Sequence, residues 1–418
     1  MDTISSFGAL SDLRIIDLTQ MLAGPYATMM LADHGATVIK IEGPEGDMTR
    51  AGGPFRKDDE EKLLGGYFQS IDRNKESVCL DLKSEEGKAA FKALVLDADA
   101  VVENFRSGVM ERLGLGYEVL QEINPRLVYG TLRGFGDART GKSPYNDWPA
   151  FDVVAQAMGG IMAITGPDPN TPTKVGPGVG DIIPGMMLGF GVLSAIHHAR
   201  RTGQGQFVDI SMVDAVLAVC ERTVWQNSVL GLVPGPEGNH HPFLCPFGMY
   251  PAADGFVTIA AHQDRFFEFL CQTLDAPELP HDPRFLDHAK RGANKGALIE
   301  ALSARTCAFT KDELSRMLGG KIPFGPVLNI SEIFDDPHFA AREMLVDVEQ
   351  PGLEPVKIVG VPIKMTRTPG KVVRRGPYLG EHTELRLREA GLDEDVVARV
   401  MSALAQPWKK EEKGMVES

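Results

Sequence analysis

The stretch from Leu13 to Arg50 constrains the fold most, because it places a strand, a turn, a helix and a second strand within a few residues. Its first segment, 13–18, is a short apolar run typical of a buried strand. Gly24 then gives a turn its conformational freedom, and Pro25 suits the first position of a helix, where its missing N–H costs nothing. We expect that helix to cover residues 26–33.

Gly35 follows as a left-handed helix cap, and residues 36–42 predict the second strand. The unit is therefore β-α-β, and its two strands should be parallel. In an open parallel sheet ligands bind beyond the carboxyl ends of the strands, here residues 19–25 and 43–50. The segment lacks the Gly-x-Gly-x-x-Gly spacing of a dinucleotide site, which argues against NAD or FAD.

The rest of the chain continues this alternation of strands and helices. Strands are predicted at 77–82, 100–104, 127–132 and 206–212, and helices at 84–98, 151–163, 184–201 and 213–230. Two loops rich in glycine and proline are expected at 134–150 and 165–181, and strand-like segments return at 344–349 and 356–365. We predict an α/β fold with a large open parallel-sheet (Rossmann-like) domain and a smaller α/β domain. Residues 226–328 would form the small domain with its linkers, between an N-terminal part, 1–225, and a C-terminal part, 329–418.

Composition excludes several classes of function. The net charge of −14, with no basic tract, argues against nucleic-acid binding. We find no apolar run long enough to span a membrane and no signal peptide, so the expected location is the cytoplasm. Five widely spaced cysteines without a Cys-x-x-Cys pair, and ten histidines in no ligand pattern, predict neither a disulfide framework nor a metal site.

Asp181 is the strongest catalytic candidate from the residues alone. It follows Gly176-Pro177-Gly178-Val179-Gly180 and precedes an apolar helix that we expect to begin at Pro184. Glycines there allow a ligand or another chain to approach the backbone, and a helix N-terminus favours an ionised carboxylate. The alternative is that Asp181 is a simple helix cap, although Pro184 at the first helical position would put the cap at Ile183.

Basic and amide side chains follow the predicted strands and point to an anionic ligand. Asn104, Phe105 and Arg106 end one strand, and Arg133 ends the next. The carboxyl ends of parallel strands share one sheet edge, so these groups should lie together. Further candidates are Arg73, Asn74, Lys75 and Arg112. Taken singly, each charged residue is equally well explained as a solvated surface group.

Two segments resemble the class III CoA-transferases, the formyl-CoA transferase family, whose superfamily also contains the α-methylacyl-CoA racemases. They are LAGPYATMMLADHGATVIKIE followed by GDMTR, and VGDIIPGMM followed by ARRTGQGQFVDISMVDAV. The resemblance implies that Asp181 occupies the position of the nucleophile, that no cofactor is permanently bound, and that an acyl-CoA is a substrate. It also implies that residues 1–225 and 329–418 form one large domain around the smaller one, and that two interlocked chains form a homodimer.

A carboxylate nucleophile suits this chemistry. It attacks the donor thioester to give a mixed anhydride and CoA thiolate, and the thiolate then forms an aspartyl-CoA thioester and releases the donor acid. The acceptor acid reverses these steps. A backbone N–H must hold the oxyanion, and Gly180 or a glycine in the 235–248 loop is a candidate.

By resemblance, several positions would line the CoA site: Met21, Leu22, Ala23, Asn74, Lys75, Asn104, Phe105, Arg112 and Arg133. Arg106 is added to them as a candidate because it follows the same strand end as Asn104 and Phe105. Gly43 and Pro44 stand where the family carries an adenine-side arginine. Leu22 stands where the oxalate-using enzymes have a glutamine, which argues against oxalate and formate.

Three functions remain open at this point. The leading one is CoA transfer, with succinyl-CoA as the expected donor and a short dicarboxylate as the acceptor. A racemase needs a His-Asp pair where this chain has Phe151-Asp152. The third possibility is a non-catalytic acyl-CoA-binding protein. His240 and His241 lie where the family carries a lid over the active site; either could bind an acceptor carboxylate or face solvent.

Overall fold

The computed structural model describes residues 7–404. They divide into two compact units: the first contains residues up to 161, 175–222 and from 339 onward, and the second contains 162–174 and 223–338. The segment predicted as the small domain, 226–328, lies inside the second unit.

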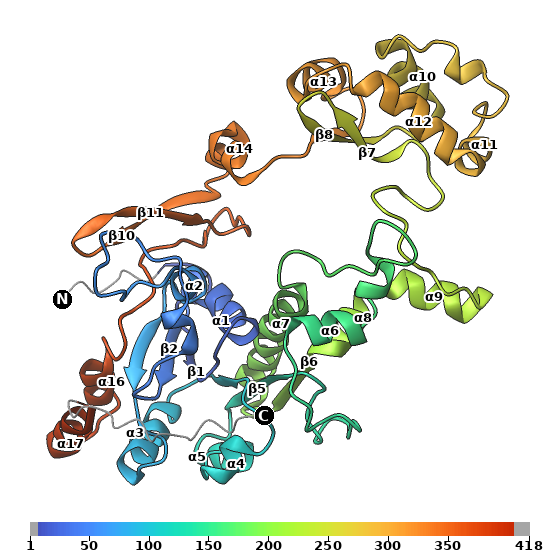
Figure 1. The fold of residues 1–418 in the computed structure, drawn as a ribbon. Coiled ribbons are helices and arrows are strands. Elements are labelled where there is room, and N and C mark those ends of the chain that lie inside the picture. Colours follow the sequence, from blue (N-terminus) through green and yellow to red (C-terminus); the bar gives the residue numbers. More distant parts are fainter. Residues whose placement is uncertain (1–6, 405–418) are drawn as a thin grey trace, which may run out of the picture. The chain divides into compact units, whose positions relative to one another are not determined.

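A six-stranded sheet organises the first unit (Figure 1). Its order is β3-β2-β1-β4-β5-β6, the order of doubly wound nucleotide-binding sheets. Every neighbouring pair is parallel, which confirms the predicted parallel sheet. The strands are β1 (Arg14–Asp17), β2 (Thr37–Glu42), β3 (Glu76–Cys79), β4 (Ala100–Glu103), β5 (Val128–Arg133) and β6 (Phe207–Ser211).

Helices cover both faces of the sheet because successive strand residues point to opposite sides. Ile15 packs on the face covered by α1 (Ala23–Asp33) and α7 (Val179–Thr202), whereas Ile16 packs on the other. The second face is covered by α3 (Glu85–Val95), α5 (Tyr117–Ile123), α16 (Thr383–Glu389) and α17 (Glu394–Leu404). Figure 1 shows α16 and α17, the last helices of the chain, beside α3. The two ends of the sequence therefore build one core.

The remaining elements of the first unit are short. They are η1 (Met48–Ala51), α2 (Gly66–Ile71), α4 (Val109–Arg112), α6 (Asp152–Met158), α8 (Met212–Ala218) and the antiparallel pair β10 (Leu345–Gln350) and β11 (Leu353–Val359). The strand predicted at 356–365 therefore begins and ends earlier than expected, because it pairs in register with β10.

The second unit has its own sheet and core. Antiparallel β7 (Phe247–Ala252), β8 (Gly255–Ala260) and β9 (Phe324–Pro326) pack with α10 (Asp264–Thr273), α12 (Lys295–Thr306) and α13 (Lys311–Leu318). The other helices are η2 (Met162–Ile164), η3 (Leu279–His281), α11 (His288–Ala293) and α14 (Ile330–Asp335). Two more cross the unit boundaries, α9 (Glu221–Leu230) and α15 (Pro337–Ala341).

The first predicted β-α-β unit is confirmed, with one change at the start of its helix. Gly35 has the expected left-handed φ of 99°. However, α1 begins at Ala23, so Pro25 is its third residue, still within the first turn whose N–H groups lack helical partners. Gly24 lies inside the helix, where a Cβ would come within 2.4 Å of Thr19. Its role there is close packing.

The predicted start of α7 is wrong. The helix begins at Val179, so it includes Asp181, and Pro184 lies inside it. The expected loop 165–181 therefore ends three residues early, and the single helix predicted over 213–230 is divided into α8 and α9. By length and composition α7 is apolar enough to cross a membrane, which contradicts the reading that no such run exists. In this unit one face of α7 packs into the core through Leu188, Val192 and Ile196.

A cluster of buried charges stabilises the end of β1. Asp17 is fully buried and accepts hydrogen bonds from the backbone N–H of Thr19, 2.8 Å away, and from Lys75 Nζ, 2.9 Å away. Lys75 also contacts Asp72 at 2.7 Å, and Lys40 Nζ donates to the carbonyl of Thr19 at 2.7 Å. Burial opposes ionisation, but Lys75 and Lys40 together lower the pKa of Asp17. The cluster therefore holds both backbone groups of Thr19, at the start of the loop that leads into α1.

Candidate active site

A cavity of about 470 Å³ lies at the carboxyl ends of the central strands, where the strand order reverses between β1 and β4. This is the place where doubly wound sheets bind their ligands. Its walls include Asp181 and, of the predicted CoA contacts, Met21, Leu22, Ala23, Asn104, Phe105, Arg106, Arg112 and Arg133. The structure thus brings the nucleophile candidate together with most of the predicted binding residues.

Asp181 lies in the first turn of α7 and is half-buried. The glycines before it allow the protein's own chain to approach. A Cβ at Gly178 would lie 2.9 Å from the side chain of Leu22, and one at Gly180 would lie 2.5 Å from the carbonyl of Asp152. The glycine-rich segment therefore fits α7 closely against neighbouring elements, where we had expected space for a ligand or another chain.

The backbone N–H groups at the start of α7 are all engaged within the protein. The N–H of Gly180 donates to Asp152 Oδ1 at 2.8 Å, so it is not available for the predicted oxyanion role. Val179 donates to Pro177, while Asp181 and Ile182 both donate to Gly178. An oxyanion donor has to come from another part of the site.

The electrostatic surroundings of Asp181 differ from the sequence expectation. Burial, and then the carboxylate of Asp152, raise the pKa of Asp181 to about 7. We had expected the helix N-terminus to keep this group ionised, but its N–H groups are turned to other acceptors. Tyr67 also lines the cavity, and burial followed by the charge of Asp181 raises the pKa of its phenol. Asp181 therefore changes its ionisation near neutral pH.

The three arginines of the cavity differ in their partners. Arg133 is nearly buried and donates to Glu103 at 2.7 Å, to Asp137, and to the carbonyl of Phe105 at 3.2 Å. In contrast, Arg106 and Arg112 are exposed, and their guanidinium groups bind no other side chain among residues 7–404. Arg133 therefore supports the loop after β4, while Arg106 and Arg112 remain available to an anionic ligand.

Asn104 also binds the protein itself. Its side chain accepts from the N–H of Gln20 at 2.8 Å and donates to the carbonyl of Gln20 at 2.7 Å. The next residue, Met21, has a left-handed φ of 67°, which few non-glycine residues adopt. Asn104 thus holds the loop between β1 and α1 at Gln20, and the buried cluster holds it at Thr19.

Asn74 and Lys75 are not among the residues that line the Asp181 cavity. The side chain of Asn74 binds Asp33, Lys371 and Val373, and that of Lys75 is buried in the cluster at Asp17. Both residues precede β3, whereas the other predicted contacts follow β1, β4 and β5.

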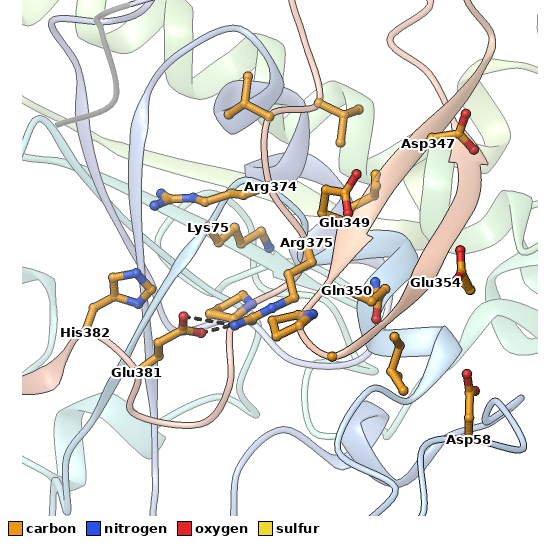
Figure 2. Close-up of a pocket in the computed structure, with 17 residues that line it drawn as sticks. Asp58, Lys75, Asp347, Glu349, Gln350, Glu354, Arg374, Arg375, Glu381 and His382 are labelled. Carbon is orange, nitrogen blue, oxygen red and sulfur yellow. Dashed lines mark hydrogen bonds and ion pairs between the residues drawn. The ribbon is translucent and has the colours of Figure 1, made fainter. Parts of the chain in front are cut away.

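Lys75 instead lines a second cavity of about 880 Å³, beside the β10–β11 pair (Figure 2). The carboxylates of Asp347, Glu349 and Glu354 lie around this cavity. Arg375 and Glu381 also line it, and they form an ion pair of 2.9 Å that is drawn in Figure 2. Arg375 is therefore engaged by an acidic side chain of the protein itself.

The two predicted substrate histidines belong to the second unit. His241 Nδ1 accepts hydrogen bonds from the N–H groups of Phe243 and Leu244, which fold the loop around it. The ring of His240 packs against Tyr250 with centroids 5.3 Å apart, and burial lowers its pKa. Burial thus favours the neutral form of the His240 imidazole. Its role toward a substrate stays a prediction, as does that of His241.

Sequence reasoning missed three features of the site. Tyr67 lies in a loop-rich stretch with no signal of its own. Trp148 lines the cavity from the predicted surface loop 134–150, held by ring contacts with Tyr145 and Phe135. Asp152 was considered only as the partner of a missing racemase histidine. A cluster of aromatic residues in that loop was the available signal for Trp148. Within residues 7–404 no group of three or more histidine, cysteine or acidic side chains is arranged to hold a metal ion.

Comparisons with known proteins agree with this site. The model of CoA-transferase family III matches residues 10–383. Succinyl-CoA:mesaconate CoA-transferase of Haloarcula hispanica is 49% identical over 92% of this chain and 97% of that protein. Acetyl-CoA:oxalate CoA-transferase of Acetobacter aceti is 42% identical over 84% of this chain and 90% of that protein.

A solved structure, that of a CAIB/BAIF family protein from Brucella suis, has a TM-score of 0.84 and 35% identity. It covers 92% of this chain, and this chain covers all of it. The family model extends over most of the sequence, including both segments on which the resemblance was based. The chain belongs to CoA-transferase family III and is a class III CoA-transferase.

Proposed function

We propose that this enzyme transfers CoA from succinyl-CoA to a short dicarboxylate through Asp181. The observation that carries the proposal is the placement of Asp181 in a cavity at the switch point, with Arg106 and Arg112 unpaired on its wall. The choice of substrates is supported by relatives whose names specify succinyl-CoA with mesaconate, D-citramalate or glutarate.

Every covalent bond that forms or breaks in the reaction belongs to the Asp181 carboxylate or to the two substrates. Ionised Asp181 attacks the thioester carbonyl of succinyl-CoA, the C–S bond breaks, and a mixed anhydride and CoA thiolate form. The thiolate attacks the aspartyl carbonyl of the anhydride and releases succinate, leaving an aspartyl-CoA thioester. The acceptor carboxylate then attacks the aspartyl carbonyl and displaces the CoA thiolate, which gives a second mixed anhydride. The thiolate finally attacks the acceptor carbonyl of this anhydride, so that the acceptor leaves as its CoA thioester and the Asp181 carboxylate is free again. No group is gained or lost overall.

Residues around the cavity have separate roles in this proposal. Arg106 and Arg112 bind the phosphates of CoA through charge-assisted hydrogen bonds. Asn104, Lys75 and Arg133 act by holding the loops that shape the site. The backbone of Met21, Leu22 and Ala23 forms the wall that faces the thioester arm.

Intact-protein mass spectrometry tests the covalent mechanism. The enzyme is incubated with succinyl-CoA, the adduct is trapped with hydroxylamine or borohydride, and peptides are mapped. We expect modification at Asp181, and we expect Asp181→Asn to lose the adduct and lower the transfer rate by about 10⁴-fold or more, as removal of a covalent nucleophile does. An Asp181→Asn protein that still transfers CoA would exclude the proposal.

Acceptor choice is tested by loss of the adduct on addition of mesaconate, glutarate, citramalate or oxalate. We expect the dicarboxylates to discharge the enzyme, and oxalate to do so poorly because Leu22 lacks the amide of a glutamine. The racemase alternative predicts exchange of the α-proton in deuterated water, and a pure binding protein predicts no turnover. Neither has a supporting observation here, since Phe151 stands where a racemase needs histidine.

We also propose that the enzyme is a cytoplasmic homodimer. The support comes from large apolar side chains left exposed on α7 and α9 within their own units, among them Phe190, Trp225 and Leu230. The interlocked arrangement of the two chains rests on the family resemblance. The expected partners are the two small-molecule substrates and a second copy of the chain, with neither nucleic acid nor membrane.

A further inference from the structure

We propose that Asp152 is a positioning residue of the transfer reaction, which fastens the first turn of α7 and places a fixed negative charge beside Asp181. The inference rests on the proposed function, because it concerns how the same nucleophile is held and when it ionises. It assigns a role to a side chain that the transfer chemistry itself does not use.

Asp152 connects α6 to the segment that carries the nucleophile. It is the first residue of α6, and its Oδ1 accepts the N–H of Gly180, the residue before Asp181, at 2.8 Å. The Gln156 amide donates to both Asp152 carboxylate oxygens at 2.9 Å. Gln156 is fully buried, and its Oε1 accepts the N–H of Val175 at 2.9 Å. Asp152 and Gln156 therefore hold both ends of the glycine-rich segment 175–180.

Position 180, whose backbone packs against Asp152, can hold only glycine. A Cβ at Gly180 would lie 2.5 Å from the carbonyl and 3.0 Å from Oδ1 of Asp152, and 3.1 Å from Ala155. Glycine thus lets the backbone of α7 come close enough for its N–H to reach the carboxylate. The carboxylates of Asp152 and Asp181 are themselves neighbours, since a Cβ at Gly178 would lie 3.8 Å from an oxygen of each.

The charge of Asp152 is not neutralised by a cation. Its hydrogen-bond donors are amides, and it forms no ion pair with any residue between 7 and 404. The other ionisable groups facing Asp181 are Tyr67 from α2 and the cavity side chains Arg106, Arg112, Arg133 and Asp147. Arg133 is already paired with Glu103 and Asp137, and α1 presents no charged side chain to the cavity.

This arrangement makes capture of the donor depend on pH near neutrality. Burial and Asp152 raise the pKa of Asp181 to about 7. The protonated acid is not a nucleophile, so kcat/KM for succinyl-CoA should rise as pH increases through that value. Removing the charge of Asp152 lowers the pKa of Asp181 and moves this rise to lower pH.

The test is the pH profile of kcat/KM for succinyl-CoA between pH 5 and 9, with mesaconate as acceptor, in the full-length enzyme. Asp152→Asn keeps an oxygen for the Gly180 N–H but removes the charge, and Asp152→Ser is a second neutral acceptor in case the amide disturbs Gln156. We expect both to shift the acid limb down by about one pH unit, the effect of one nearby like charge. Gln156→Ala keeps the charge and loosens the segment, so it should lower kcat and leave the limb in place.

Asp214→Asn is the matched control, because Asp214 is an exposed acidic residue in the first turn of another helix of the same unit. It should leave the profile unchanged. If the Asp152→Asn and Asp152→Ser variants transfer CoA and the acid limb of their pH profile equals that of the wild type, the role of Asp152 is overturned while the proposed function stands. Absence of transfer by the wild-type enzyme with every donor and acceptor would overturn the proposed function, and this inference with it.

Discussion

At the scale of single residues, hydrogen-bond partners divide the predicted CoA contacts with polar side chains into two groups. Arg133, Asn104 and Lys75 use their polar atoms on the protein itself. Arg106 and Arg112 bind no side chain within residues 7–404 and stay exposed at the cavity. A bound anion would therefore supply hydrogen-bond acceptors to Arg106 and Arg112 only. Sequence position alone could not separate the two, because Asn104, Arg106 and Arg133 all lie at or just after the carboxyl ends of strands, yet belong to different groups.

Replacing Arg106 or Arg112 by alanine should therefore weaken binding of succinyl-CoA without changing the chemical step. Hydrogen bonds to charged groups contribute about 1.5–3 kcal/mol, which corresponds to a rise in KM of roughly ten- to a hundredfold. Initial-rate kinetics would show a raised KM with kcat nearly unchanged. Arg126→Ala, an exposed arginine that does not line the cavity, is the control. Unchanged KM in both cavity variants would show that phosphates bind elsewhere.

At the scale of secondary-structure elements, local patterns predicted the strands well and one helix start badly. The apolar runs of β1, β2 and β4 are buried on both faces, so composition alone identifies them. The start of α7 was misplaced because Pro184 is typical of a first turn. The structure extends the helix to Val179 because α6 and Leu22 pack against that turn, and such tertiary contacts leave no local signature.

The buried cluster below the β1–α1 loop predicts a large loss of stability when one partner is removed. Lys75, Asp17 and Asp72 are all fully buried. Lys75→Met would remove the ion-pair partner of Asp17 and leave Asp72 with Lys40 alone, 3.6 Å away. Breaking a buried ion pair in this way typically costs about 3–5 kcal/mol. Thermal and denaturant unfolding should show a marked drop for Lys75→Met.

Lys88→Met is the matched control for this prediction. Lys88 forms an ion pair with Glu85 at 2.8 Å on the surface of the same unit, where solvent screens the interaction. Its unfolding transition should lie close to that of the wild type. Equal transitions for Lys75→Met and the wild type would mean that the cluster does not stabilise the loop.

At the scale of the whole molecule, the sequence predicted an α/β chain with a second unit between two parts of the first. The dimer was predicted from the family resemblance, because a single chain does not show how two copies associate. A prediction follows from the outer side of α7, where Phe190 is 75% exposed although the opposite side of the helix is in the core. An apolar helix face of this kind usually meets a partner.

Phe190→Asp should therefore shift the enzyme from two chains toward one, measured by analytical ultracentrifugation over a range of concentrations. A charge in a desolvated interface lacks a partner and weakens association. Leu96→Asp, on an exposed apolar residue outside α7, should leave the dimer intact. A wild-type enzyme that sediments as a single chain would contradict the dimer directly.

The return of the chain to its first unit has a consequence for the order in which the protein is made. Phe91 shares its core with Leu387, Val397 and Val400, and Asn74 is held by residues 371–373. A ribosome must therefore finish residues 223–338 before it can supply these contacts, a delay on the order of ten seconds at usual elongation rates. During that time this face of the newborn sheet is covered only in part, by α3 and α5. Chaperones that bind exposed apolar strands can therefore act on the nascent chain in this interval, before α17 leaves the exit tunnel.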